Sequence, residues 1–283
     1  MRRSTKGLIL LTGVAAAAIL YGFHWFYRTA RPEAVEGPGF RMEDLVSGGT
    51  SDGGIPSVDV PVFEPVADAD QYLKDEGLGL AVEVGGKRRF YPFQILVWHE
   101  VVHDAFGDKS LVITFSPLTM TGMVFERPDP STVFHVSGSL WNNNLVLFDE
   151  TTHSLWSQIL GKAVGGERTG TVLSSYPSIV STWTDWKVEN PRGEVLSRES
   201  STNQNRDYTR DPYGSYYAAP AILFPLTSVD ARLPAKKLVC VATVDGKRTT
   251  YPLEYKQKPE NCTQGFWFVF AAAFPNIEIF QLP

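Results

Sequence analysis

Two histidines and two acids stand within six residues in the segment that runs from His99 to Asp104. Its first five residues read HExxH, a motif that holds zinc when it lies on a helix, because positions i and i+4 then share one face. In that interpretation His99 and His103 bind zinc or another divalent transition metal. Glu100 is then the general base that activates the bound water. The segment is therefore a candidate metal centre, and Glu100 is its candidate catalytic residue.

A zinc site of this kind needs a third protein ligand. The metzincin continuation would place a histidine where this chain has Lys109, so His135 or His153 is the better candidate. The simpler alternatives are a buried His99 paired to its neighbouring acid, a His103 stabilised at a helix end, and a His135 satisfied within a strand. The sequence leaves both interpretations open.

Composition and charge limit the partners. The chain has 283 residues, of which 43% are hydrophobic and 20% charged, which is enough for one large domain. All 31 acidic residues follow residue 31, where 21 of the 26 Lys and Arg remain, so this part carries a net charge of 21 − 31 = −10. Nucleic acid and anionic lipid need a basic surface. We therefore expect no nucleic-acid partner.

The N-terminus predicts a membrane anchor. Residues 7–27 form an apolar run of 21 residues, long enough to span a bilayer as a helix, and basic residues precede it. The basic flank predicts that residues 1–6 are a cytoplasmic stub and that the rest lies outside the cytoplasm. A cleaved signal peptide is the alternative, but no small-x-small cleavage site follows. Residues 28–55 have the composition of a flexible tether, so a single extracytoplasmic domain is expected over 56–283.

The elements that must position the site are mostly strands. Residues 80–92 and 240–252 share the pattern V-x-G-K-R-x-x-Y-P and predict a duplicated β-hairpin. Pairing of the two copies in one sheet is a further expectation. Short strands are expected at 111–115, 123–126, 133–136 and 145–148, and a buried helix at 92–106. The expected fold is a β-rich α+β domain, a mostly antiparallel sheet or partly closed barrel with a few short helices. Cys240 and Cys262 predict either one disulfide or two buried thiols.

Several motifs in order resemble a known family. The chain reads FYPFQILVWHEVVHDAFGDKSLVITFSPLTMTGMVFER, then FHVSGSLWNNNLVLFDETTHSLWSQILGKAVGG, STWTDWK and RDYTRDPYGSY. This is similar to the prokaryotic domain-of-unknown-function family numbered 3179, with its AYP, HE-hydrophobic-VND, TYCPLC-G, SG, N, D-R-x-T-x-S-L-W-x-Q and second AYP motifs. The resemblance covers about residues 56–255. It implies a fold relationship and the location of a site, and the family has no established activity.

Three departures from the family pattern concern the site. His103 stands where the family has Asn, Ser116 and Thr119 replace the two cysteines of the TYCPLC motif, and His153 stands where the family usually has Glu. Hydroxyl groups cannot supply the thiolate or redox chemistry of two cysteines. A metal bound here would therefore have nitrogen and oxygen ligands. The alternative is that this copy has lost its activity and remains as a scaffold.

The sequence thus yields three hypotheses of function. The first is a membrane-anchored extracytoplasmic protein whose polar, metal-binding pocket serves a binding or accessory role toward a small molecule or an envelope protein. The second is a zinc-dependent hydrolase, and the third is a degenerate envelope scaffold. The residues expected to line the pocket, three of which are also candidate metal ligands, come from four separate segments: His99, Asp104, Ser116, Thr119, His135, Ser137, His153, Trp156 and Gln158.

Overall fold

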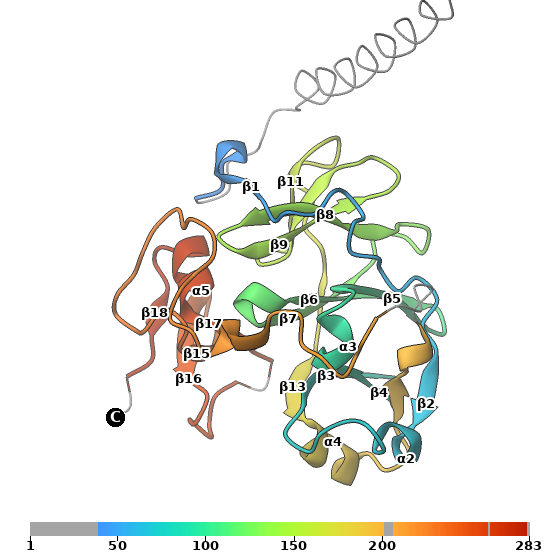
Figure 1. Cartoon of the computed structure of the whole chain (residues 1–283). Coiled ribbons are helices and arrows are strands. Elements are labelled where there is room, and N and C mark those ends of the chain that lie inside the picture. Colours follow the sequence, from blue (N-terminus) through green and yellow to red (C-terminus); the bar gives the residue numbers. More distant parts are fainter. Residues whose placement is uncertain (1–38, 201–205, 260, 282–283) are drawn as a thin grey trace, which may run out of the picture. The chain divides into compact units, whose positions relative to one another are not determined.

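The structure is a computed structural model that describes residues 39–200, 206–259 and 261–281 (Figure 1). The anchor expected at residues 7–27 and the cytoplasmic stub before it lie outside the described residues. Within the described residues, no helix is long and apolar enough to cross a membrane.

Four sheets and a few short helices make up the described chain. Sheet A has the strand order β1-β8-β9-β10-β11, sheet B has β12-β7-β6-β5, sheet C has β13-β3-β4-β14-β2 and sheet D has β17-β15-β16-β18. The strands are β1 (Val46–Ser47), β2 (Phe63–Pro65), β3 (Leu78–Val84), β4 (Lys87–Pro92), β5 (Val101–Phe106), β6 (Lys109–Ser116), β7 (Thr121–Glu126), β8 (Phe134–Trp141), β9 (Asn144–Asp149), β10 (Leu155–Ser157), β11 (Lys162–Gly165), β12 (Ser175–Tyr176), β13 (Ile179–Thr182), β14 (Glu194–Leu196), β15 (Leu238–Val244), β16 (Lys247–Pro252), β17 (Thr263–Phe266) and β18 (Glu278–Ile279). The helices are α2 (Val66–Ala69), α3 (Phe93–Leu96), α4 (Trp183–Glu189) and α5 (Trp267–Ala273), with 3-10 turns η1 (Met42–Asp44), η2 (Pro117–Thr119), η3 (Arg198–Ser200) and η4 (Gly214–Tyr217).

The prediction of a β-rich, mostly antiparallel fold is confirmed, and the four strands expected between residues 111 and 148 form. The partly closed barrel is not adopted by the described residues, which form four open sheets. Both hairpins form, but β3–β4 belongs to sheet C and β15–β16 to sheet D, so the two are not paired in one sheet.

The duplication extends beyond the hairpins to two whole units, which we call the N-terminal and C-terminal repeats. In the N-terminal repeat, β13 pairs antiparallel with β3, α4 follows, and β14 pairs parallel with β4. In the C-terminal repeat, β17 pairs antiparallel with β15, α5 follows, and β18 pairs parallel with β16. The strand order and directions are therefore the same in both.

The registers of the repeats match residue by residue. Each helix begins with a buried tryptophan, and the N–H of Trp183 donates to Gly77 O (2.7 Å) as that of Trp267 donates to Lys237 O (2.9 Å), each acceptor standing just before the first strand. Arg89 opposes Glu194 across β4 and β14, and Thr249 opposes Glu278 across β16 and β18. The two units are thus superposable in topology and register, although few side chains are shared.

Sheet B is buried on both faces, which explains the one wrong prediction of an element. One face packs against sheet C through residues such as Val102 and Phe115, and the other packs against sheet A through Val101 and Val112. A strand covered on both sides carries a continuous apolar run, which periodicity alone does not distinguish from a buried helix. The helix expected over 92–106 therefore ends at Leu96, and β5 takes its second half.

Two further features concern the ends of the domain. Residues 39–55, expected to be part of a tether, include η1 and β1, and Phe40 is fully buried beside Trp141. At the other end, Cys240 and Cys262 are joined by a disulfide with a Cα–Cα distance of 5.5 Å, within the usual range for such bonds. The domain's apolar core thus extends N-terminal to the expected boundary at residue 56.

Candidate functional site

Glu100 occupies an unusual backbone position between α3 and β5. Its N–H donates to Leu96 O (2.7 Å) and its φ is +60°, so it takes the left-handed position that ends a helix and that glycine usually fills. A side chain there costs on the order of 1 kcal/mol. The carbonyl of Glu100 accepts from Phe115 N–H (2.8 Å), which fixes the turn to β6. The sequence therefore places a charged residue where both backbone strain and burial oppose it.

The Glu100 side chain lines a cavity of about 180 Å³. Ser116, at the end of β6, and Tyr213 line the same cavity, and the rest of its wall is mostly apolar or backbone. Ser116 Oγ accepts a hydrogen bond from Leu145 N–H (3.1 Å), so its own hydroxyl proton is left to donate. Gly138, with a φ of +69°, also lines the cavity, and a Cβ there would collide with Thr50 O. We call this space the Glu100 cavity.

Burial decides the charge of Glu100. It raises the pKa of the carboxyl to about 8, and the hydrogen bond from the Tyr213 hydroxyl to Glu100 Oε1 (3.2 Å) only partly offsets this. Burial, together with the neighbouring carboxylate, also raises the pKa of Tyr213. At neutral pH the cavity therefore holds a protonated carboxylic acid beside a neutral phenol and a neutral hydroxyl.

The two histidines of the HExxH motif have separate partners. His99 Nδ1 lies 2.8 Å from Pro56 O, and Nε2 lies 2.7 Å from the Tyr208 hydroxyl. His103 Nε2 accepts from Phe134 N–H (2.9 Å), so its proton is on Nδ1, which donates to Asp59 Oδ1 (3.0 Å). Burial lowers the pKa of both imidazoles, and for His103 it outweighs the opposing effect of Asp59.

This geometry does not meet the premise of the zinc interpretation. His99 lies in the turn after α3 and His103 lies in β5, so no helix carries both rings on one face. All four ring nitrogens are engaged in hydrogen bonds, and a metal would have to displace them. Among the residues that the structure describes, no group of three or more His, Cys, Asp or Glu side chains is arranged to hold a metal ion.

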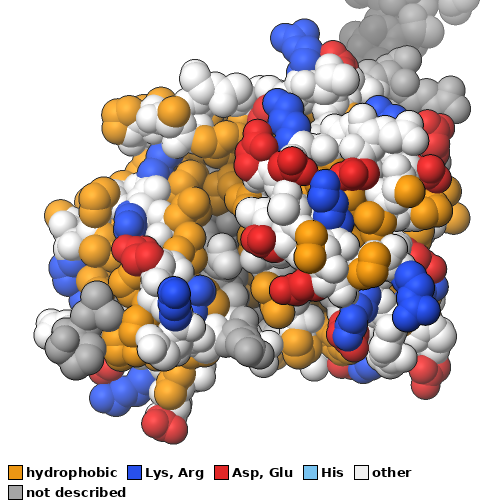
Figure 2. All heavy atoms as spheres, turned by 90° about the horizontal axis from the view of Figure 1, so that it is seen from below, with side chains coloured by type: hydrophobic (Ala, Val, Ile, Leu, Met, Phe, Trp, Pro, Cys, Tyr) orange, Lys and Arg blue, Asp and Glu red, His pale blue; other side chains and the backbone are white. Residues whose placement is uncertain are grey.

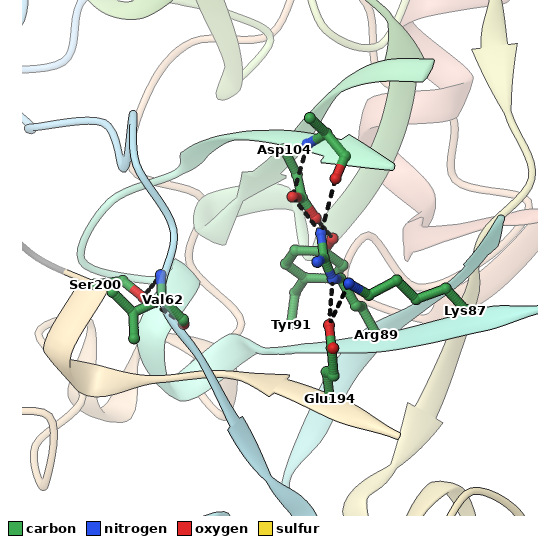
Figure 3. Close-up of polar contacts among 8 residues, drawn as sticks. Val62, Lys87, Arg89, Tyr91, Asp104, Glu194 and Ser200 are labelled. Atoms are coloured by element: carbon green, nitrogen blue, oxygen red, sulfur yellow. Dashed lines mark hydrogen bonds and ion pairs between the residues drawn. The ribbon is translucent and has the colours of Figure 1, made fainter. Parts of the chain in front are cut away.

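Asp104 lies outside the Glu100 cavity, in a buried ionic network (Figure 3). Arg89 Nη1 donates to Asp104 Oδ1 (2.5 Å) and Arg89 Nε to Glu194 Oε2 (2.8 Å), while the Tyr91 hydroxyl donates to Asp104 Oδ2. The guanidinium lies over the ring of Phe63, 3.9 Å from its centroid. Asp104 therefore joins sheet B to sheet C, which is a structural role.

Thr119 and Gln158 also belong to a structural network, next to Ser116. The hydroxyl of Thr119 lies 2.8 Å from that of Thr121, which donates to Gln158 Oε1 (2.9 Å), and Asn144 Nδ2 donates to all three oxygens. Gln158 Nε2 donates to Thr114 Oγ1 (3.0 Å). Hydroxyl and amide groups satisfy one another here, as buried polar groups must. The network occupies the place that the resemblance assigns to the second motif cysteine.

The remaining predicted pocket residues do not line the Glu100 cavity. Ser137 Oγ donates to Val146 O (2.6 Å), and Trp156 is fully buried with its Nε1 donating to Asp149 (3.0 Å). His135 is partly buried and His153 is exposed, and their rings lie against Phe148 on sheet A. Of the predicted pocket residues, Ser116 lines the cavity of Glu100, and His99 is the sequence neighbour of that residue.

Residues that sequence reasoning did not select complete the site. Tyr213, which donates to Glu100, and Tyr208, which contacts His99, both come from the RDYTRDPYGSY segment that belongs to the family resemblance. The composition of this polar loop does not indicate which of its tyrosines contact the site. Their place in a segment shared with the family is the feature from which such a contact could have been expected. Arg89 lies within the predicted hairpin at 80–92, and that pattern does not indicate its ion pair with Asp104.

The fold and the site together define a β-rich α+β domain with an internal repeat and a small cavity built around a buried carboxylic acid. Within that class, the model of the family described as "Protein of unknown function (DUF3179)" matches residues 52–265, and the chain belongs to that family. Neither the curated proteins nor the solved structures contain a match. Glu100 and Ser116, which the resemblance assigns to the HE and TYCPLC motifs, both line the Glu100 cavity.

Proposed function

We propose that this protein binds a small organic molecule with an oxygen acceptor, such as a carbonyl group, in the Glu100 cavity. The protonated carboxyl of Glu100 and the hydroxyl of Ser116 supply hydrogen-bond donors, and the apolar wall accommodates a compact body. An apolar cavity of about 150 Å³ takes up benzene, so about 180 Å³ suffices for a substituted ring of similar size. Binding to a neutral acid donor is favoured by the low local dielectric.

The observation that carries the proposal is Glu100 itself. The fold bears two costs at this residue, namely burial of a carboxyl, which raises its pKa, and a left-handed backbone. Among the described residues, the hydrogen-bond partner of the side chain is the Tyr213 hydroxyl at 3.2 Å. Local rules are broken together mainly at functional sites. Residues that serve only the fold, such as Asp104, are by contrast fully paired.

A binding role fits the side chains better than the two alternatives from the sequence. The zinc hydrolase needs His99 and His103 to release hydrogen bonds that hold β5 and the Pro56 segment. A scaffold without a ligand gains nothing from the strained acid at position 100. The cavity donors, a neutral acid and a hydroxyl, suit an organic acceptor more than a metal ion, which prefers ionised or nitrogen ligands.

The proposal includes a location. The apolar run at residues 7–27 supports a membrane anchor, and the Cys240–Cys262 disulfide supports a domain in an oxidising compartment outside the cytoplasm. Thiol labelling of cells checks this: the two cysteines should react with a maleimide only after reduction, and labelling without reduction would contradict the location.

Matched probes test the binding site. Acetophenone, titrated by NMR into the full-length chain in detergent with detergent blanks, should bind with a Kd on the order of 0.1–1 mM, and ethylbenzene, which lacks the acceptor, about tenfold more weakly. Glu100→Leu should lose about tenfold for acetophenone, while Glu100→Gln, which retains a donor, should lose little. The exposed control Glu189→Gln should bind as the wild type does. Equal binding of the two probes, an unaffected Glu100→Leu, or no saturable binding of acetophenone would overturn the proposal.

A further inference from the structure

A second and larger pocket lies on the other side of the loop that carries Tyr208 and Tyr213. Its volume is about 400 Å³, within the range of small-molecule sites. Its floor is apolar, because Phe93 and Phe115 stack there with ring centroids 4.1 Å apart. The α3 turn, the end of β6 and the 208–217 loop therefore line a pocket with an apolar floor.

Tyrosines form the walls of this pocket. Tyr72 lines the pocket with its hydroxyl donating to Glu64, and Tyr208 and Tyr217 line it as well. Aromatic walls over an apolar floor favour a flat, apolar or aromatic body. The aromatic lining thus predicts a ligand with a flat apolar or aromatic group, and it does not determine the charge of that ligand.

The rim of the pocket is basic in a protein that is otherwise acidic. Lys74, Arg198 and Arg210 line it, and none of the three forms an ion pair with an acid among the described residues. The guanidinium of Arg198 lies 3.8 Å from the ring centroid of Tyr72, which holds it at the rim. The one acid of the lining, Asp211, accepts from Tyr213 N–H (2.8 Å). With the carboxylates of Asp211 and of Asp207, which interacts with Arg210, counted against them, the three cations still leave a net positive charge at this opening.

We propose that this pocket binds an amphipathic anion, a molecule with a flat apolar body and a carboxylate or phosphate group. The body lies on Phe93 and Phe115, and the anionic group lies at the rim among the three cations. Guanidinium groups bind carboxylates and phosphates through paired hydrogen bonds. The site is separate from the Glu100 cavity, since the two pockets share no lining residue.

Two ligands that differ only in charge test this inference. Calorimetry with the full-length chain in detergent, corrected with detergent blanks, compares 2-naphthoate with the neutral 2-naphthamide. We expect 2-naphthoate to bind at one site per chain at least about tenfold more tightly than 2-naphthamide. Raising the salt from about 0.05 to 0.5 M should weaken the binding of 2-naphthoate alone.

Substitutions at the rim locate the effect. Lys74→Gln, Arg198→Gln and Arg210→Gln should each weaken 2-naphthoate about three- to tenfold and leave 2-naphthamide unchanged. Arg192→Gln, an exposed position outside the pocket, makes the same charge change and should have no effect. Thermal unfolding verifies that each variant is folded. Glu100→Leu should not alter 2-naphthoate binding, which separates this result from that of the Glu100 cavity. Three results would overturn the inference: equal affinity for the two ligands, no saturable binding of 2-naphthoate, or unchanged 2-naphthoate binding in a variant that combines Lys74→Gln, Arg198→Gln and Arg210→Gln.

Discussion

The two repeats share their topology and differ in where their second strand leads. After Pro92 the N-terminal repeat continues into α3 and the strained turn at Glu100, which places the candidate site at the edge of sheet B beside β8 of sheet A. After Pro252 the C-terminal repeat continues into a short turned segment and then Cys262, which closes a disulfide. The segment that follows the hairpin of the N-terminal repeat thus carries the candidate site, and the segment that follows the hairpin of the C-terminal repeat carries a disulfide.

The means of stabilisation also differ at equivalent positions. The N-terminal repeat has Arg89, which reaches Asp104 of sheet B, where the C-terminal repeat has Thr249. The C-terminal helix α5 is buried along its whole length, whereas α4 exposes Asp185 and Glu189. Seen from below in Figure 2, hydrophobic and charged side chains are interspersed on both repeats, the C-terminal one on the left and the N-terminal one on the right. One copy is therefore held by polar links to the site sheet, and the other by apolar burial and a disulfide.

Removing Arg89 should produce the largest loss of stability. Arg89→Met leaves Asp104 buried without its cation, which costs about 3–5 kcal/mol of unfolding free energy, measured by urea denaturation. Thr249→Ala, the equivalent position of the C-terminal repeat, should cost less than about 0.5 kcal/mol. The double variant Arg89→Met with Asp104→Leu should regain much of the loss, since no unpaired charge remains. If the unfolding free energy of Arg89→Met were within about 1 kcal/mol of that of the wild type, the two repeats would be stabilised in the same way at this position.

The disulfide should contribute nearly as much, but to the C-terminal repeat alone. Replacing both Cys240 and Cys262 with serine removes a crosslink between residues 22 positions apart, which costs about 3 kcal/mol. Hydrogen exchange should rise in β15 to β18 and leave β3, β4 and β5 protected. Faster exchange spread evenly over both repeats would contradict a division of labour between them.

The features that the sequence could predict are those with a local pattern of residues. The hairpins were predictable because a glycine turn and alternating residues are local signals. The sequence allowed the Cys240–Cys262 disulfide but left two buried thiols as the alternative, because the distance between two cysteines does not show in a sequence. The helix that the HExxH interpretation requires was predicted wrongly because sheets A and C, which are distant in sequence, cover both faces of β5, so that Val101, Val102 and Phe106 imitated the spacing of a buried helix. Glu100 and Ser116 could be nominated from motifs, whereas their meeting with Tyr213 depends on a loop contact across 113 residues of sequence. No local pattern encodes such a contact.

The pH dependence of stability should separate the site from the rest of the N-terminal repeat. The pKa of Glu100 is near 8 in the folded protein and near 4.5 when unfolded, so the folded state binds more protons between these values and stability falls as pH rises. From pH 5 to 7 this amounts to about 2–3 kcal/mol. His99 and His103, whose folded pKa values are lowered, act in the opposite direction, because their stabilisation is lost as pH falls below about 6.5.

The difference between wild type and Glu100→Gln isolates the acid from the two histidines, since both proteins keep the imidazoles. Urea unfolding of the two proteins at pH 5, 6, 7 and 8 gives this difference directly. Glu100→Gln should gain stability relative to wild type as pH rises. A constant difference across this range would mean that Glu100 is ionised in the folded protein, and its role as a neutral donor would fail.

The one ion pair that both repeats share should have the smallest effect. Lys87 lies 3.1 Å from Glu194, and Lys247 lies 3.1 Å from Glu278, at equivalent positions and with all four side chains at least 39% exposed. Solvent screens such pairs, so Lys87→Met and Lys247→Met should each cost at most about 0.5 kcal/mol in urea unfolding.

Glu194→Gln should cost more than Glu278→Gln, because Glu194 also accepts from the buried Arg89 and its carboxyl helps to hold that guanidinium in place. Burial opposes ionisation of Glu194, yet the hydrogen bonds from Arg89 and Lys87 outweigh it and lower the pKa. The excess cost of Glu194→Gln should therefore shrink as pH falls through that lowered pKa, and an equal cost of the two glutamate variants at neutral pH would show that the shared pair works alike in both repeats.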